Sequence, residues 1–219
     1  MVALRLVVGL WSVAALAQSV HPITGRQIAG VMGMGGADWL VRVEREMEEE
    51  PDKALDAIGV SKGSVAADVG AGVGYFTWRL AQRVGPMGRV YANDIEPRMI
   101  ERLKKNIAAR GLRNVESVLG AEDDPRLPAG AIDLILLVDV YHEFSKPQQM
   151  LRKMRESLAA GGRLVLLEYR KEDPSVPIRF EHKMTVEEVR AELEAEGFRF
   201  DKNLTVLPRQ HILVFRAAP

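Results

Sequence analysis

Apolar residues recur along the chain with two alternating spacings, one typical of strands and the other of helices. Short, almost wholly apolar runs predict five β-strands, at 65–69, 89–93, 115–119, 132–138 and 163–169. Between them, apolar residues three or four positions apart predict α-helices, at 75–84, 97–111, 145–161 and 185–197. Two final runs, 198–207 and 211–215, predict a hairpin. Apolar strands separated by helices indicate a parallel sheet covered on both faces, to which the hairpin adds one antiparallel strand at the edge.

Two of these helices carry a local start signal. Ser145 is followed three residues later by Gln148, and Thr185 is followed at the same spacing by Glu188. This is the spacing of a capping box, in which the two side chains bond each other's backbone N–H groups. We therefore expect one helix to begin at each pair.

The segment before the first strand is glycine-rich at first and then strongly charged. Residues 25–36 predict an extended arm or loop. Asp38 can cap a helix that runs to Glu50, and a second, short helix follows Pro51. The acidic run at the end of the first helix, 48–50, is expected to be a solvated face.

The first residues have the pattern of a secretory signal peptide. Arg5 precedes the apolar run 6–17, which ends in Ala15-Leu16-Ala17, an A-x-A cleavage pattern, and is too short to span a bilayer. An apolar helix packed on the domain is the alternative. We expect a signal peptide at 1–17, an arm or lid at 18–52 and the main domain at 53–219. The processed protein would be exported (periplasmic or secreted) and not membrane-bound; without processing it would be cytoplasmic.

Composition restricts the classes of function. A chain of 219 residues is long enough for one sizeable core, and one domain is the natural expectation. Lys plus Arg and Asp plus Glu number 30 each, so no overall charge favours a nucleic-acid partner. The chain has no cysteine, which excludes disulfides, thiolate metal sites and cysteine nucleophiles.

The most informative motif is the segment Asp68-Val69-Gly70-Ala71-Gly72-Val73-Gly74, between a predicted strand and a predicted helix. Glycines there let a ligand approach the backbone, and the N–H groups at the start of the helix suit an anionic group. A dinucleotide site requires G-x-G-x-x-G, whose third glycine would fall at position 75. That residue is Tyr75, and the third glycine is Gly74. The spacing therefore disfavours a nicotinamide or flavin cofactor.

Asp94 ends the second predicted strand, about twenty residues after the glycine loop, where an acid would bind a ribose diol. Hydrogen bonds to a charged group contribute about 1.5–3 kcal/mol each. The alternative role for Asp94 is the N-cap of the helix that opens near Pro97.

Four motifs in order resemble the class I S-adenosylmethionine (SAM) dependent methyltransferases: "VAADVGAGVGYF", "VYANDIEPRMIERLKKN", "VLGAEDDPRLPAGAIDLILLVDVYHEF" and "LRKMRESLAAGGRLVLLEYR". The resemblance covers roughly 53–215. It implies a single-domain, Rossmann-like, doubly wound α/β fold with an N-terminal helical arm. It also implies a mostly parallel seven-stranded sheet of order 3-2-1-4-5-7-6, with strand 7 antiparallel.

The same resemblance assigns cofactor contacts. Asp68, Gly70, Gly72 and Gly74, with Ala71, would surround the methionine part of SAM. Asp94, with Ile95 beside it, would hold the ribose, and the adenine would lie by Glu122 or Asp123. Val138 and Asp139, at the end of the fourth strand, would border the methyl group. The arm lies outside the shared core of the family and is a candidate lid in this arrangement.

Polar residues that follow the fourth and fifth strands mark the expected acceptor site, because ligands of open parallel sheets bind beyond the carboxyl ends of the strands. His142 and Glu143 follow the fourth strand, and Glu168 ends the fifth. His182 lies in the next connection, and His211 reaches the same edge if the preceding turn does.

His142 is the first choice as general base if the acceptor is a hydroxyl, with a packing or loop-capping role as the alternative. Tyr141 and Tyr169 are expected to be pocket walls. A metal site drawn from the three histidines with Glu143 or Glu168 is chemically possible. Its spacing matches no ligand motif, so no metal is expected.

The sequence as a whole therefore predicts a SAM-dependent methyltransferase (EC 2.1.1.-) acting on a small-molecule acceptor. One alternative is a protein that binds SAM without turnover, as a sensor or structural partner. The other is an NAD(P)-dependent oxidoreductase, which the position of Gly74 disfavours.

Overall fold

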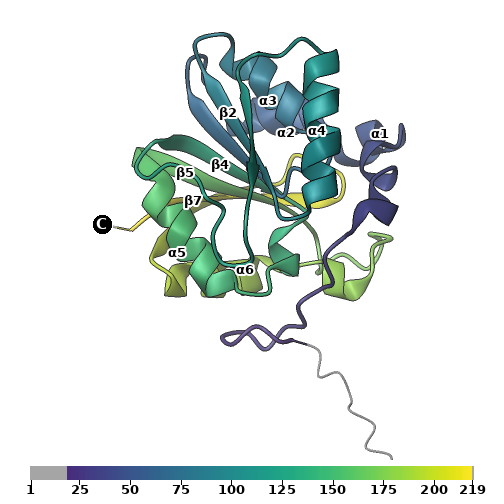
Figure 1. The fold of residues 1–219 in the computed structure, drawn as a ribbon. Helices are drawn as coiled ribbons and strands as arrows, with labels where there is room; N and C mark the ends of the chain where they lie inside the picture. The colour runs from purple at the N-terminus through teal and green to yellow at the C-terminus, as the bar shows by residue number, and fades with distance from the viewer. Residues whose placement is uncertain (1–18, 219) are drawn as a thin grey trace, which may run out of the picture.

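The computed structural model describes residues 19–218, so the predicted signal peptide lies outside the described residues. Seven strands form one sheet in the order β3-β2-β1-β4-β5-β7-β6 (Figure 1). β1 pairs in parallel with β2 and β4, and β7 is antiparallel to both β5 and β6. The predicted fold class and strand order are therefore confirmed.

The elements alternate between strand and helix through most of the chain. The strands are β1 (Val65–Val69), β2 (Arg89–Asp94), β3 (Val115–Leu119), β4 (Ile132–Val138), β5 (Leu158–Tyr169), β6 (Phe198–Leu204) and β7 (Gln210–Ala217). The α-helices are α1 (Arg45–Glu49), α2 (Pro51–Ile58), α3 (Thr77–Val84), α4 (Pro97–Ala109), α5 (Pro147–Ser157) and α6 (Val186–Ala195). Four short 3₁₀ turns join them among the described residues: η1 (Met34–Gly36), η2 (Trp39–Val41), η3 (Tyr141–Glu143) and η4 (Phe180–His182).

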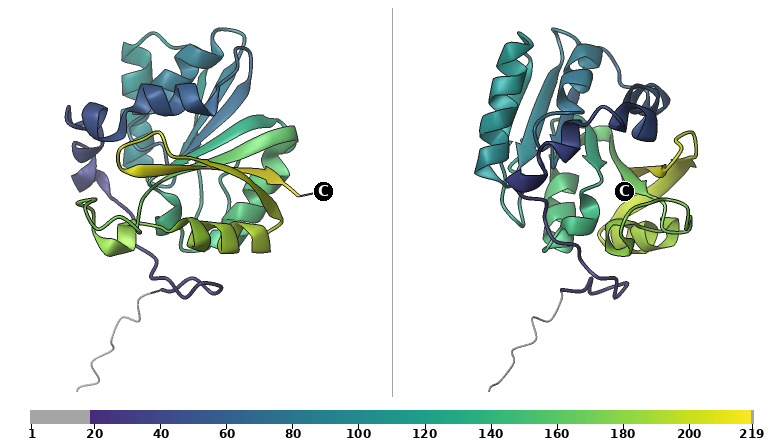
Figure 2. Two further views of the ribbon diagram at one scale, coloured as in Figure 1. Left: turned by 180° about the vertical axis from the view of Figure 1, so that it is seen from behind. Right: turned by 90° about the vertical axis from the view of Figure 1, so that its right-hand side faces the viewer.

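The sheet is buried on both faces because successive strand residues point in opposite directions. In β1, Ala66 packs into a cluster with α2 and α3, whereas Ala67 packs into a cluster with α5 and α6. Figure 2 shows these two helix layers on opposite sides of the sheet. All seven residues of β4 except Asp133 and Val138 are buried, which explains why this strand is apolar almost throughout.

Two predicted helix starts have different outcomes. Thr185 and Glu188 form the expected capping box at the start of α6. Ser145 and Gln148 do not: α5 begins at Pro147, a residue whose fixed φ suits the first helical position. The Gln148 side chain instead donates a hydrogen bond to Glu196, at 2.9 Å.

Other boundaries also differ from the predictions. α5 ends at Ser157 rather than at the glycines, because Leu158 already pairs with Ile132 of β4 across a bulge. The helix predicted from Asp38 to Glu50 is reduced to η2 and α1, and the Asp38 side chain caps neither. Its carboxylate pairs with Arg102 at 2.8 Å.

The arm before α1 is attached to the domain by a buried ion pair. Arg26 donates to both carboxylate oxygens of Glu192 in α6, at 2.8 and 3.0 Å, and to the backbone oxygen of His142 at 3.1 Å. The backbone N–H of Ala29 also donates to His142, at 3.0 Å. The arm therefore runs directly beside the carboxyl end of β4. Within residues 19–218, none of the helices is long and apolar enough to cross a membrane.

Candidate active site

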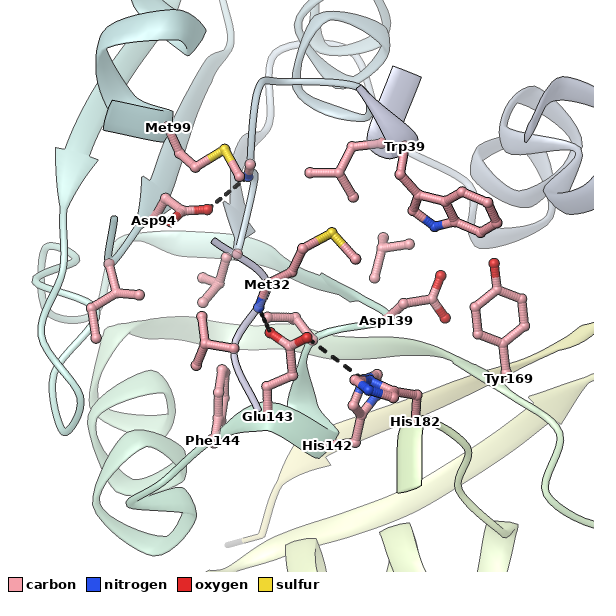
Figure 3. A pocket seen from close by; sticks show the side chains of 18 of the residues that line it. Met32, Trp39, Asp94, Met99, Asp139, His142, Glu143, Phe144, Tyr169 and His182 are labelled. Atoms are coloured by element: carbon pink, nitrogen blue, oxygen red, sulfur yellow. Dashed lines mark hydrogen bonds and ion pairs between the residues drawn. The ribbon is translucent and has the colours of Figure 1, made fainter. Parts of the chain in front are cut away.

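A cavity of about 540 Å³ lies at the carboxyl ends of the parallel strands, with the arm on one side of it (Figure 3). Its position agrees with the rule that open parallel sheets bind ligands at this edge. The strands and the loops after them supply Val69, Gly70, Gly72, Asn93, Asp94, Ile95, Ala121, Glu122, Val138, Asp139, Val140, His142, Glu143, Phe144, Ser145 and Tyr169, and the helices α4 and α5 add Met99 and Met150. The arm and the segment before His182 supply the remaining lining residues.

Asp94 holds the glycine loop in place at one end of this cavity. Its carboxylate accepts the backbone N–H of Gly72 at 2.8 Å and that of Glu96 at 2.9 Å (Figure 3 shows the first). Glu96, and not Asp94, is the N-cap of α4. Burial raises the pKa of Asp94, while these two backbone hydrogen bonds oppose the rise. The Gly72 and Glu96 N–H groups bond different oxygens, and a carboxylate has about four acceptor positions, so positions remain for a ligand hydroxyl.

Most of the predicted cofactor residues line the cavity, and four do not. Gly70, Gly72, Asp94, Ile95, Glu122, Val138 and Asp139 line it, whereas Asp68, Ala71, Gly74 and Asp123 are outside it. Asp123 points to Lys146 instead, with its carboxylate 3.2 Å from the ammonium. Of the two acids considered beside an adenine, the structure places Glu122 at the cavity.

Asp68, in β1, bonds the first residue of α3 and so joins the two elements that flank the glycine loop. Its carboxylate accepts the Thr77 hydroxyl at 2.6 Å and is 2% exposed. Burial raises the pKa of Asp68 to about 6, although the Thr77 hydrogen bond and the charge of Arg45 act against the rise. The charge of Asp94 adds to it.

A buried network of acids forms the wall between the arm and β5. Arg45 donates to Glu49 at 2.8 Å, and the Tyr169 hydroxyl donates to the other oxygen of Glu49 at 2.9 Å. Glu49 is 1% exposed, so the prediction of a solvated acidic face is wrong for this residue. Asp139 lies close by, and its pKa is raised well above the ordinary value by burial and by the charges of Glu49 and Glu168.

His142 occupies the other end of the cavity, on η3 directly after β4 (Figure 3). Its Nδ1 lies 2.7 Å from Glu168 Oε2, and the second oxygen of Glu168 accepts the Tyr141 N–H at 3.0 Å. Burial alone would lower the pKa of His142, but the charge and hydrogen bond of Glu168 outweigh it and the pKa is raised. Glu168 thus fixes the ring so that Nε2 faces away from it.

Two further residues meet His142 at this end. His182 Nδ1 lies 3.1 Å from His142 Nε2, and Glu143 Oε1 lies 4.0 Å from the same nitrogen. Burial raises the pKa of Glu143 to about 7, against the opposing effect of His142. His211 does not join them, because its Nε2 bonds Glu172 at 2.9 Å.

The structure adds arm residues to the site that the sequence did not single out. Val31, Met32, Trp39, Leu40, Arg45 and Glu49 all line the cavity. The sequence interpretation did not use the spacing of Arg45 and Glu49, four residues apart on a helix, although that spacing allows an ion pair. Of the two tyrosines expected as pocket walls, Tyr169 lines the cavity, and Tyr141 is fully buried in the core instead.

Residues 60–203 match a family whose description is methyltransferase domain. The chain belongs to this family. Among solved structures, the chain is similar to a SAM-dependent methyltransferase from Aquifex aeolicus, with 25% identity and a TM-score of 0.80. That match covers 84% of this chain and 98% of the other.

Two curated relatives of the chain are named as methyltransferases. A ubiquinone/menaquinone biosynthesis C-methyltransferase of Hahella chejuensis is 30% identical, over 57% of this chain and 49% of the relative. Nocamycin O-methyltransferase of Saccharothrix syringae is 33% identical, over 50% of this chain and 36% of the relative. The chain therefore spans about half or less of the length of these relatives.

SAM is the cofactor of this family, and the cavity fits it in two respects. Asp94 offers free lone pairs for a ribose diol beside the glycine loop. At the centre of the cavity wall, Asp139 Oδ1 is buried and finds no hydrogen-bond partner among residues 19–218, while Oδ2 accepts from Gln210 at 2.7 Å. A buried carboxylate oxygen without a partner suits a positively charged ligand, which SAM is.

Proposed function

We propose that this protein transfers a methyl group from SAM to a small organic acceptor, and that His142 takes a proton from that acceptor. The observation that carries the proposal is the continuity of one cavity, which joins Asp94 and the glycine loop to the His142–Glu168 pair. A cofactor held at the first end and an acceptor at the second would share one enclosed space.

SAM supplies a methyl group that is already activated by a positively charged sulfur. The main task of the protein is then to hold the acceptor in line with that group. Glu168 would support His142 by accepting its Nδ1–H, which leaves the lone pair on Nε2 toward the cavity. His142 Nε2 can therefore accept a hydroxyl proton as the acceptor attacks.

The walls of the cavity support a small acceptor with an apolar part. Phe144, Ile178 and Trp39 line the cavity, and Arg179 adds a positive charge to its wall. The names of the relatives, a ubiquinone/menaquinone biosynthesis C-methyltransferase and nocamycin O-methyltransferase, support the same class of acceptor. No excess of basic residues supports a nucleic-acid acceptor.

The test is transfer of label from methyl-tritiated SAM into a bacterial metabolite extract, followed by identification of the labelled product. Labelled product that depends on the protein supports the proposal. SAM binding in calorimetry without product from any extract would favour a SAM-binding protein without turnover. Binding of NADH in place of SAM would favour the oxidoreductase.

A further inference from the structure

Two histidines and one glutamate converge at the acceptor end of the cavity, from η3 and η4. The three ligand atoms of His142, Glu143 and His182 all lie within 4.8 Å of one another. Figure 3 shows the Glu143 carboxylate turned toward the pair of imidazole rings. We propose that these side chains bind one divalent transition-metal ion, such as Zn²⁺ or Fe²⁺.

The distances are close to those that such an ion requires. Two ligands at about 2.05 Å from a tetrahedral ion are about 3.3 Å apart. His142 Nε2 and His182 Nδ1 are 3.1 Å apart. Glu143 Oε1 is 4.0 Å from His142 Nε2, so it needs to approach by about 0.7 Å. The proposed site therefore requires a rotation of the Glu143 side chain when the ion binds.

The groups behind the ligands already have the arrangement found around metal-bound histidines. A ligating histidine usually donates its second N–H to a carboxylate, which fixes the lone pair on the other nitrogen. Glu168, which is fully buried, is the carboxylate in this role for His142, with its Oε2 2.7 Å from His142 Nδ1. The Met32 N–H holds Glu143 through its other oxygen, Oε2, at 3.4 Å, which leaves Oε1 for the ion.

Charge and donor type select the class of ion. Two buried carboxylates, Glu143 and Glu168, flank the imidazole pair, and the nearby Arg26 is already paired with Glu192. A divalent cation would balance both carboxylates in their ionised form. Imidazole nitrogens suit Zn²⁺ and Fe²⁺, whereas Mg²⁺ and Ca²⁺ prefer sites made wholly of oxygen. Two histidines and one carboxylate leave coordination positions open toward the cavity.

This inference goes beyond the proposed function and does not depend on methyl transfer. The ion and a proton use the same lone pair on His142 Nε2, so they are alternative occupants. In the loaded protein the ion would take over activation of the acceptor, because a hydroxyl bound to such an ion loses its proton more readily. An acceptor with an oxygen donor is then the class that the loaded site binds.

The experiment titrates the untagged full chain, stripped with a chelator, with Co²⁺ and follows the visible absorption bands of the ion. We expect one ion per chain, and displacement of the bands by Zn²⁺. His182→Ala and Glu143→Gln should each weaken Co²⁺ binding by more than about a hundredfold. Loss of a residue that only hydrogen-bonds a metal ligand already lowers metal affinity about 10–100-fold, and these two residues are proposed as ligands themselves. His211→Ala is the matched control, a histidine paired with Glu172 outside the cluster, and should bind Co²⁺ as the parent does.

Calorimetry with SAM shows that each variant keeps its fold, independently of any turnover. Absence of bands in the parent protein would overturn the proposal, as would full binding by both His182→Ala and Glu143→Gln. Loss of binding in His211→Ala alone would place the ion elsewhere and overturn it too. None of these results depends on whether a methylated product is found.

Discussion

Replacement of Gly70 by alanine tests whether the glycine loop is held by close contact with the end of β4. Gly70 has φ +75°, a backbone conformation that disfavours a side chain. An added Cβ would lie 2.9 Å from Val140 Cβ and closer still to one of its methyl groups. Gly63, at the other end of β1, has φ +79° and open space where a Cβ would be. Gly63→Ala therefore reproduces the backbone strain without the contact.

The two variants should differ by the cost of that contact. Left-handed backbone costs a residue with a side chain about 1–2 kcal/mol, which is the whole expected effect of Gly63→Ala. Overpacking typically adds about 1–3 kcal/mol, so Gly70→Ala should lose about 2–5 kcal/mol. For a chain of this size each kcal/mol lowers Tm by roughly 2–4 °C. Gly70→Ala should also weaken SAM binding, because Gly70 lines the cavity and Gly63 does not.

The assay is denaturant unfolding of both single variants, of Val140→Ala, and of the double variant Gly70→Ala/Val140→Ala. Removing the two methyl groups of Val140 should restore part of the difference, as a coupling of about 1–3 kcal/mol in the double-mutant cycle, while the contact with Val140 Cβ at 2.9 Å remains. Equal losses in Gly70→Ala and Gly63→Ala would refute the reasoning. So would a coupling indistinguishable from zero, because the contact with Val140 is the only difference invoked.

Three further predictions concern single side chains. Asp94→Asn should weaken SAM binding about ten- to a hundredfold, or about 1.5–3 kcal/mol, in calorimetry. The control variant Asp133→Asn alters an exposed carboxylate that also accepts a backbone N–H, at 2.8 Å, and it should leave SAM binding unchanged. His142→Ala should leave SAM affinity nearly unchanged and lower turnover on the order of a hundredfold or more. The control variant His211→Ala should retain the parent rate. Equal turnover rates in the two variants would show that His142 is not the general base. The pKa of Asp68 is raised from 3.8 to about 6, so the folded state holds this proton more tightly and the free energy of unfolding falls as pH rises through that window. Asp68→Asn should remove roughly 2–3 kcal/mol of this fall in denaturant titrations between pH 3.5 and about pH 7, and an unchanged slope would contradict the assignment.

Local patterns in the sequence determined the fold and one end of the site. All seven strands were predicted near their observed places, because a strand buried on both faces must be apolar and the helices between them need a spaced apolar stripe. The capping box at Thr185 is local as well, since both of its partners lie within one helical turn. Asp94 follows the glycine loop at a characteristic separation, and the structure places both at the cavity.

Only the tertiary structure decided which polar side chains are buried and which of them meet. Glu49 and Glu48 are neighbours in one acidic run, yet Glu49 is buried against Tyr169, 120 residues away in sequence. His142 and His182 are separated by 40 residues and meet, whereas His211, at the same edge of the sheet, is captured by Glu172. No spacing rule relates such pairs, because loops of varied length bring them together. Burial and hydrogen bonding select the partner only after the sheet has placed the loops side by side.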